Sequence, residues 1–246
     1  MNTETKGERI AKVIARSGYC SRREAERLIM AGEVKVNGKV IDSPALNITD
    51  QTIKINNKLL QTKEPTRLWV FHKPKGTIVS HDDPSKRLSV FELLPPTMPR
   101  VIAVGRLDIN TEGLLLLTNN GDLSKYISHP STEWTRRYRV RVYGKINKAR
   151  FDSLAKKGAI IDGIKYAPIK IEIDKERDFN SWLNISIIEG KNREIKKVME
   201  FLGLQVNRLI RVSFGPFHLG SLRAKGLREV PMKTLKELVG NKVKLD

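Results

Sequence analysis

The chain has 246 residues, 39% of them apolar, which is enough to bury a full hydrophobic core without disulfides or metals. Its 46 Lys and Arg residues exceed its 27 Asp and Glu residues by 19, and such an excess indicates a polyanionic partner, most often nucleic acid. The single cysteine excludes an internal disulfide, and the sequence contains neither a signal peptide core nor an apolar run of about 20 residues, so we expect a soluble, cytoplasmic protein without a membrane partner.

The first 60 residues predict two short helices and a hairpin. Apolar residues recur at helical spacing over residues 9–30, and Ser21 to Glu24 has the pattern of a helix-starting capping box. Residues 34–40 alternate and contain Asn-Gly, a strong hairpin signal. The cations that we expect to be exposed on the helices are Arg22, Arg23 and Arg27, beside Lys12 and Arg16.

This helix–helix–hairpin order, with the wording of residues 22–38, resembles the small RNA-binding module first known from ribosomal protein S-four, also called the alpha-L module. The resemblance implies that residues 8–60 form a small α+β domain that binds RNA phosphates and RNA shape through these five cations. A merely solvated helix face is the alternative. Residues 61–67 are polar with a central proline and predict a linker, so a second domain is expected over residues 68–240.

The second domain is predicted to contain buried strands on both sides of one carboxylate. Residues 68–71, 101–104 and 114–117 are short apolar runs bounded by turn residues, which is typical of core strands. Asp108 falls in the connection between the last two, where chain ends converge on pockets. Alternatively, Asp108 is a turn residue whose side chain bonds nearby amides.

Later segments add several strands and three helices. Residues 137–142 alternate strictly, so Tyr138 shares one face of a strand with two valines and three arginines occupy the other. Helices are expected at 148–157, 192–202 and 231–239, and strands within 160–173. The charged residues 81–87 form either an RNA-contacting loop or an idle surface loop.

The helix at 192–202 brings a lysine toward the core. At about 100° per residue, Ile195, Val198 and Met199 lie on its buried face. Lys196 borders that face and Lys197 points nearly opposite. We therefore expect Lys196 to reach inward and neutralise Asp108.

The segment GRLDINTEGLLLLTNNGD, residues 105–122, resembles the active-site signature of the RsuA-type family of ribosomal RNA pseudouridine synthases. Lys-Pro-x-Gly at 73–76 and the EGKNR segment at 189–193 match two further motifs of that family. The resemblance implies the α+β pseudouridine synthase fold, with a mixed, largely antiparallel sheet and a catalytic cleft.

The same resemblance implies roles for five residues. Asp108 is the expected nucleophile, Tyr138 the ring that stacks on the target base, and Lys196 the cation paired with Asp108 where many relatives have Arg. Arg106 is expected to fill the gap left by the flipped nucleotide, and Leu209 to line the pocket. As alternatives, Tyr138 and Leu209 are ordinary core residues and Arg106 is a second counter-charge.

Pseudouridine forms when the bond between uracil N1 and the ribose breaks, the base turns, and C5 takes the place of N1. No redox change or net group transfer occurs, so no cofactor or metal is expected, and the sequence contains no glycine-rich nucleotide motif. Attack of Asp108 on the sugar, attack on the base, and elimination all stay open.

Residues 81–96 and 208–215 resemble the large-subunit, RluB-like branch of the family. We therefore expect a monomer that modifies a uridine in large-subunit ribosomal RNA or in an assembly intermediate. Two alternatives are a non-catalytic RNA-binding or ribosome-assembly protein and an RNA methyltransferase, although no glycine-rich methyl-donor loop is visible.

Overall fold

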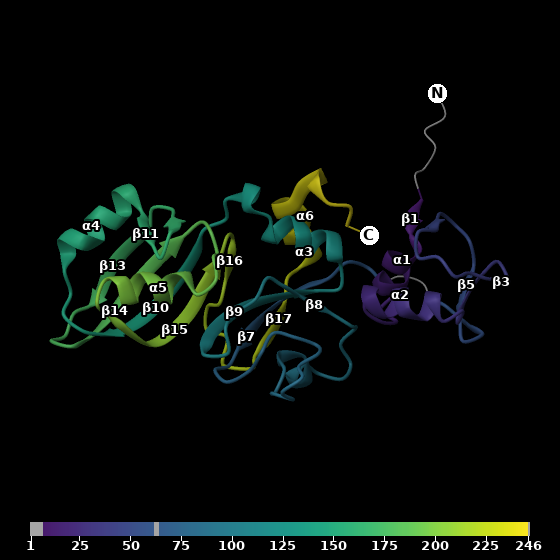
Figure 1. The fold of residues 1–246 in the computed structure, drawn as a ribbon, viewed down its shortest axis with the longest axis horizontal. Helices are drawn as coiled ribbons and strands as arrows, with labels where there is room; N and C mark the ends of the chain where they lie inside the picture. The colour runs from purple at the N-terminus through teal and green to yellow at the C-terminus, as the bar shows by residue number, and fades with distance from the viewer. Residues whose placement is uncertain (1–6, 62–63, 246) are drawn as a thin grey trace, which may run out of the picture.

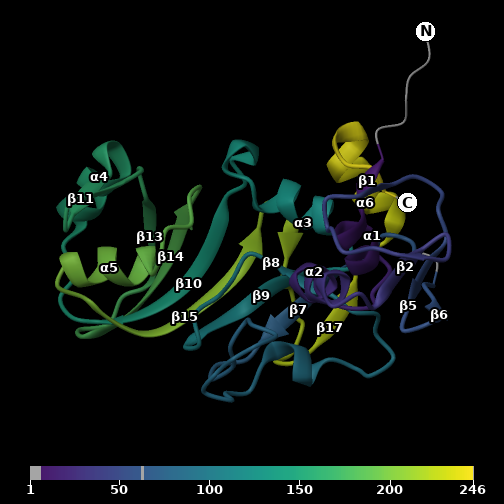
Figure 2. The same ribbon diagram turned by 45° about the vertical axis from the view of Figure 1, so that its right-hand side comes forward.

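The computed structural model describes residues 7–61 and 64–245, so part of the expected linker at 61–67 lies outside the described residues (Figure 1). Within this part of the chain, no helix has the length and apolar character needed to cross a membrane. The N-terminal region lies at one end of the molecule, and a large sheet extends from it to the other end (Figures 1 and 2).

The N-terminal region has its own core, to which two helices and a small sheet contribute. Ser21 Oγ accepts a hydrogen bond from Glu24 N at 3.1 Å, which confirms the predicted helix start. Strands β3, β2, β5 and β6 are neighbours in that order, and β1 pairs with β4. The elements are β1 (Glu8–Arg9), α1 (Ile10–Arg16), α2 (Arg22–Met30), β2 (Val34–Val36), β3 (Lys39–Val40), β4 (Asn47–Ile48), β5 (Ile53–Ile55) and β6 (Lys58–Leu59).

The large sheet contains nine of the described strands, with the main order β13-β14-β10-β15-β9-β7-β17. Strand β8 pairs with β9, and β16 with β15; only the β15–β9 pair is parallel. The expected α+β class with a mixed, largely antiparallel sheet is thus confirmed. The strands are β7 (Leu68–Lys73), β8 (Ile102–Val104), β9 (Thr111–Thr118), β10 (Arg136–Tyr143), β13 (Lys170–Lys175), β14 (Asn180–Ile187), β15 (Gln205–Phe214), β16 (Phe217–His218) and β17 (Leu227–Glu229).

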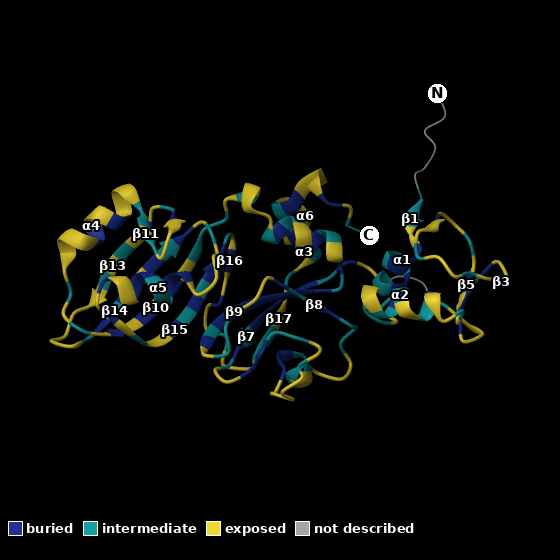
Figure 3. Cartoon of the chain, viewed as in Figure 1, coloured by how far each residue is buried: buried dark blue, intermediate teal, exposed yellow. Residues whose placement is uncertain are grey.

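Helices and short elements cover this sheet. They are η1 (Val90–Leu93), α3 (Gly121–Ser128), η2 (Pro130–Thr132), α4 (Lys148–Lys157), β11 (Ala159–Ile161), β12 (Ile164–Tyr166), α5 (Glu194–Phe201), α6 (Met232–Val239) and η3 (Gly240–Lys242). Figure 3 shows the buried residues concentrated on the strands, while the outer sides of α2 and α4 are exposed.

Strand β9 is buried on both faces, which explains its four consecutive leucines. Leu114 and Leu116 belong to the core under α3 and α6, and Leu115 and Leu117 to the core on the opposite face. All four are fully buried. The strand predicted at 114–117 is therefore part of a longer strand, Thr111–Thr118.

Two helices start slightly later than the sequence predicts. Helix α5 begins at Glu194 instead of residue 192, because Arg193 adopts a left-handed conformation with φ of 53° that cannot continue a helix. Helix α6 begins at Met232, after Pro231. Helix α4 spans Lys148–Lys157 as predicted.

Candidate active site

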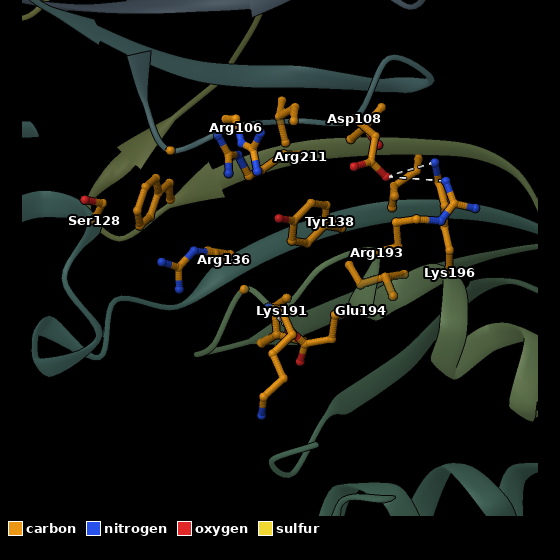
Figure 4. A pocket seen from close by; sticks show the side chains of 18 of the residues that line it. Arg106, Asp108, Ser128, Arg136, Tyr138, Lys191, Arg193, Glu194, Lys196 and Arg211 are labelled. Atoms are coloured by element: carbon orange, nitrogen blue, oxygen red, sulfur yellow. Dashed lines mark hydrogen bonds and ion pairs between the residues drawn. The ribbon is translucent and has the colours of Figure 1, made fainter. Parts of the chain in front are cut away.

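The candidate site lies where the edge of β9 changes partners. Residues Thr111–Gly113 of β9 pair with β15, whereas Leu116–Thr118 pair with β8. The sheet thus forks beside Leu114 and Leu115. The loop that carries Asp108 joins β8 to β9 at this fork, and a cavity of about 230 Å³ opens there (Figure 4).

Backbone contacts and one buried lysine fix the Asp108 loop. Thr111 N donates to Asp108 O at 2.9 Å, and Gly76 N donates to Ile109 O at 2.8 Å. The fully buried Lys73 donates from Nζ to Thr111 O at 2.9 Å and to Ile109 O at 3.3 Å. Burial lowers the pKa of Lys73 from 10.5 to about 8. The Lys-Pro-x-Gly segment therefore holds the loop that presents Asp108.

Asp108 lies between two cations at the start of α5. Lys196 Nζ is 3.1 Å from Asp108 Oδ2, and Arg193 Nη1 is 4.0 Å from the same oxygen (Figure 4). The predicted contact between Lys196 and Asp108 is therefore present. The Asp108 side chain is 35% exposed and that of Lys196 is 16% exposed, so the carboxylate is partly open to solvent.

Tyr138 lines the same cavity from β10. Its residue is 8% exposed, and the strict alternation of buried and exposed residues along β10 confirms the predicted faces. On the adjacent β15, Leu209 and Arg211 also line the cavity, and Arg211 is the register partner of Tyr138. The wall thus offers an aromatic face, an apolar side chain and a cation. Arg106, which is exposed, lines the cavity from the Asp108 loop.

The five N-terminal cations do not have equivalent surroundings. Arg22, Arg23 and Arg27 are exposed, as predicted. Lys12 Nζ instead lies 2.8 Å from Asp122 Oδ2 at the start of α3 and 2.8 Å from Glu8 Oε1. Arg16 Nη1 lies 3.9 Å from the same oxygen of Asp122. Lys12 and Arg16 thus link α1 to α3, and the sequence did not predict this contact.

Four residues at or beside the cavity escaped the sequence prediction. Arg211 is 3% exposed, and Arg136 is half-buried on the same face of β10 as Tyr138. In the sequence, Lys73 stands out only as part of the Lys-Pro-x-Gly motif. Glu194, 3% exposed, accepts from Lys191 N at 2.8 Å, while its other oxygen is buried without a hydrogen-bond partner. Burial raises the pKa of Glu194 from 4.5 to about 7.

Only weak sequence signals pointed to these residues. Arg211 sits in the alternating run Arg-Val-Ser-Phe, in which a charged residue is normally assigned to the exposed face. Within residues 7–61 and 64–245, no group of three or more His, Cys, Asp and Glu side chains is arranged to hold a metal ion.

Comparisons with known proteins identify the family to which this fold belongs. A sequence model described as RNA pseudouridylate synthase matches residues 67–201, and one described as the S4 domain matches residues 8–59. An uncharacterized RNA pseudouridine synthase of Rickettsia typhi is 44% identical over 239 residues, which cover 96% of each chain. The ribosomal large subunit pseudouridine synthase B of Yersinia pestis is 39% identical over 244 residues, covering 95% of this chain and 76% of that protein.

A crystal structure of a pseudouridylate synthase matches the fold with a TM-score of 0.66 at 27% identity, covering 94% of this chain and 100% of that one. The protein is thus an isomerase that acts on RNA. It belongs to the RNA pseudouridylate synthase family, in its RluB/RsuA-type branch with an N-terminal S4 domain.

Proposed function

We propose that this enzyme converts one uridine of large-subunit ribosomal RNA to pseudouridine, with Asp108 as the nucleophile. The observation that carries the proposal is the Asp108–Lys196 pair at the edge of a cavity that Tyr138 also lines. Relatives from Yersinia pestis and Haemophilus influenzae, each 39% identical, bear the name ribosomal large subunit pseudouridine synthase B, which supports this choice of RNA.

The reaction needs an ionised carboxylate beside the sugar and the base. Lys196 Nζ at 3.1 Å and Arg193 Nη1 at 4.0 Å place two positive charges beside Oδ2 of Asp108. The carboxylate is accessible to a substrate because its side chain is 35% exposed. Asp108 either bonds to the sugar, adds to the base, or removes a proton from the sugar; all three need the same ionised group.

The target base must leave its stack to reach Asp108. The ring of Tyr138 supplies a flat surface on which a flipped pyrimidine stacks, and Leu209 closes the pocket beside it. Arg106, exposed at the cavity, takes the place of the extruded nucleotide in the RNA stack. Extrusion costs a few kcal/mol, which contacts between phosphates and the basic surface offset.

The remaining assignments complete this proposal. Residues 8–60 form the RNA-binding domain, residues 61–67 the linker, and residues 68–240 the catalytic domain. The enzyme acts as a cytoplasmic monomer on ribosomal RNA or an assembly intermediate.

The decisive variant is Asp108→Asn, which keeps the size of the side chain and removes its charge. Tritium release from RNA labelled at C5 of uridine measures the reaction, and filter binding measures affinity. We expect no release above background and affinity within about threefold of the parent protein, since one lost contact at the cavity leaves the phosphate contacts in place. Measurable isomerisation by the variant excludes Asp108 as the nucleophile.

The choice of RNA is tested separately. Purified large-subunit and small-subunit ribosomal RNA, both free of pseudouridine, are incubated with the parent protein, and modified positions are mapped. Modification confined to one position of large-subunit RNA supports the proposal, and modification of small-subunit RNA alone contradicts it.

A further inference from the structure

Arg211 lines the cavity and carries a buried hydrogen-bond donor that has no partner in the described part of the chain. Its residue is 3% exposed, and its Nε donates to Leu114 O at 2.7 Å, at the fork of the sheet. Its Nη2 is buried and has no hydrogen-bond partner. Leaving a buried donor unpaired costs about 1–3 kcal/mol, more when it is charged, so the arrangement indicates a ligand that is not part of the protein.

Arg136 adds a second positive charge beside it. Its Nη1 donates to Ile188 O at 2.6 Å. The guanidinium groups of Arg136 and Arg211 both lie over the Phe214 ring, 4.6 Å and 5.3 Å from its centre, respectively. Burial is the largest cause of the lowered pKa of Arg136; the charge of Arg211 lowers it further, while Tyr138 and Glu194 act in the opposite direction. Among the described residues, no carboxylate forms an ion pair with either arginine. This end of the cavity is therefore suited to an anion or to strong hydrogen-bond acceptors.

The two arginines lie beside the surface on which the base is expected to stack. Tyr138 and Arg211 are register partners on β10 and β15, and Arg136 is two residues from Tyr138 on the same face. In Figure 4, Asp108 and Lys196 lie on one side of the Tyr138 ring and Arg136 lies on the other. A base that offers its sugar bond to Asp108 thus turns its far edge toward the arginines.

The base and the phosphates of a bound nucleotide are expected to lie at different depths of the cavity. A flipped nucleotide enters base first, and its phosphates stay with the RNA chain outside. Exposed cations already stand there: Arg106, and Arg193 with a side chain that is 56% exposed. A guanidinium as deeply buried as that of Arg211 meets the base, whose edge carries two carbonyl oxygens.

We propose that Arg211 is a catalytic residue whose guanidinium donates a hydrogen bond to a carbonyl oxygen of uracil and stabilises the negative charge of the detached base, with Arg136 adding a second positive charge. The proposal rests on the function proposed above and selects the two routes in which the base leaves the sugar as a free anion that is not bonded to Asp108.

The electron balance explains why a cation is useful there. When the bond between N1 and C1′ breaks, its electron pair stays with uracil, which becomes an anion with charge on N1, O2 and O4. C1′ is compensated by a bond from an Asp108 oxygen, or by the electron pair of the C2′–H bond when Asp108 takes that proton. After the base turns, its C5 supplies the pair for the new bond to C1′. As that bond forms, the Asp108 oxygen leaves C1′ with its electron pair, or the C1′=C2′ electron pair takes the proton back at C2′. C5 then loses its proton and N1 gains one.

The test compares two leaving groups. Arg211→Met and Arg211→Lys act on an RNA fragment that contains the mapped target, with either uridine or 5-fluorouridine at that position. Single-turnover loss of the unmodified nucleoside is followed by mass spectrometry. Because 5-fluorouracil is the more acidic base, it leaves with less help. The matched control is Arg139→Met, which removes a charge from the opposite face of β10, where Arg139 pairs with Asp174.

With uridine we expect Arg211→Met to lose about 100-fold in rate, as is usual when a donor to a developing anion is removed. With 5-fluorouridine the loss should shrink at least about tenfold, since less charge needs stabilising. Arg211→Lys should fall between, and Arg139→Met should match the parent on both substrates. If Arg211→Met does not fold, Arg136→Met provides the same comparison, with an expected loss of about tenfold.

Two results would overturn the proposal. An equal loss on both bases, in Arg211→Met or in Arg136→Met, means that the arginine has only a structural role. A loss confined to RNA affinity, which a neutral methylphosphonate 5′ to the target reproduces in the parent protein, means that Arg211 binds phosphate. Failure of the proposed function is distinguishable, because the parent protein itself would then be inactive on uridine.

Discussion

Lys196 Nζ lies 3.1 Å from Asp108 Oδ2, although 88 positions separate the two residues in the sequence. The contact joins the first turn of α5 to the loop between β8 and β9. The contact therefore holds α5, which precedes β15, against the loop that precedes β9.

We predict that this cation is needed for its charge. Lys196→Met should lower the rate of isomerisation by about 10- to 100-fold, because a hydrogen bond to a charged group contributes about 1.5–3 kcal/mol. Lys196→Arg keeps the charge and should stay within about tenfold of the parent. Tritium release under single-turnover conditions measures both. Lys197→Met, one residue along α5, is the matched control and should behave as the parent; a loss as large as that of Lys196→Met would refute the assignment.

The Asp108–Lys196 contact could be predicted because helical periodicity alone places Lys196 at the edge of the buried face of α5. The leucines of β9 likewise identify a strand that is buried on both faces. Arg211 could not be predicted in the same way. Its burial depends on two features: the pairing of β15 with β9 ends at Gly113, and the register between β10 and β15 shifts next to Tyr138. The pattern of apolar and polar residues along β15 encodes neither feature.

The link from Lys12 to Asp122 is a second case. Both residues lie in solvated-looking helical turns, and only the packing of the N-terminal region against α3 brings them together. Glu194 was overlooked because a glutamate in the first turn of a helix is normally exposed.

Gly113 is predicted to be indispensable for the fork. A Cβ at this position would lie 2.3 Å from Arg211 O and 2.7 Å from Arg211 N, and the backbone φ is +103°. Backbone atoms cannot move aside cheaply, so Gly113→Ala should destabilise the fold by about 3 kcal/mol or more, measured by urea unfolding. Gly163→Ala is the control, because φ is +73° there but the added Cβ meets open space. It should cost about 1–2 kcal/mol. Equal losses would mean that crowding at Arg211 is unimportant.

Glu194 predicts a pH dependence of stability. Its folded pKa of about 7 exceeds the ordinary 4.5, so the stabilisation from its protonated form is complete below about pH 4.5 and is lost as the pH rises through about 7. Glu194→Gln keeps a neutral side chain at every pH and an oxygen that can accept from Lys191 N. Relative to this variant, the parent protein should lose about 1–3 kcal/mol of unfolding free energy between pH 5 and pH 8. Urea unfolding of both proteins across this range measures the difference, and parallel curves would contradict it.

The N-terminal cations should contribute unequally to RNA binding. Arg23 is exposed and forms no ion pair among the described residues, whereas Arg22 pairs with Glu26 and Arg27 with Glu24. Lys12 already pairs with two carboxylates, one of them Asp122. A free cation releases counterions when it meets a phosphate, so Arg23→Met should reduce the slope of log affinity against log salt by about 1.

Lys12→Met should leave this salt slope nearly unchanged, because its charge is already neutralised in the free protein. Its effect should appear instead as a small loss of thermal stability, through the weakened contact between α1 and α3. Filter binding of ribosomal RNA between 50 and 200 mM salt, a range over which phosphate contacts change affinity by about 10³-fold or more, measures both slopes. If Lys12→Met lowers the slope as much as Arg23→Met, Lys12 exchanges Asp122 for a phosphate when RNA binds, and the ranking of the cations is wrong.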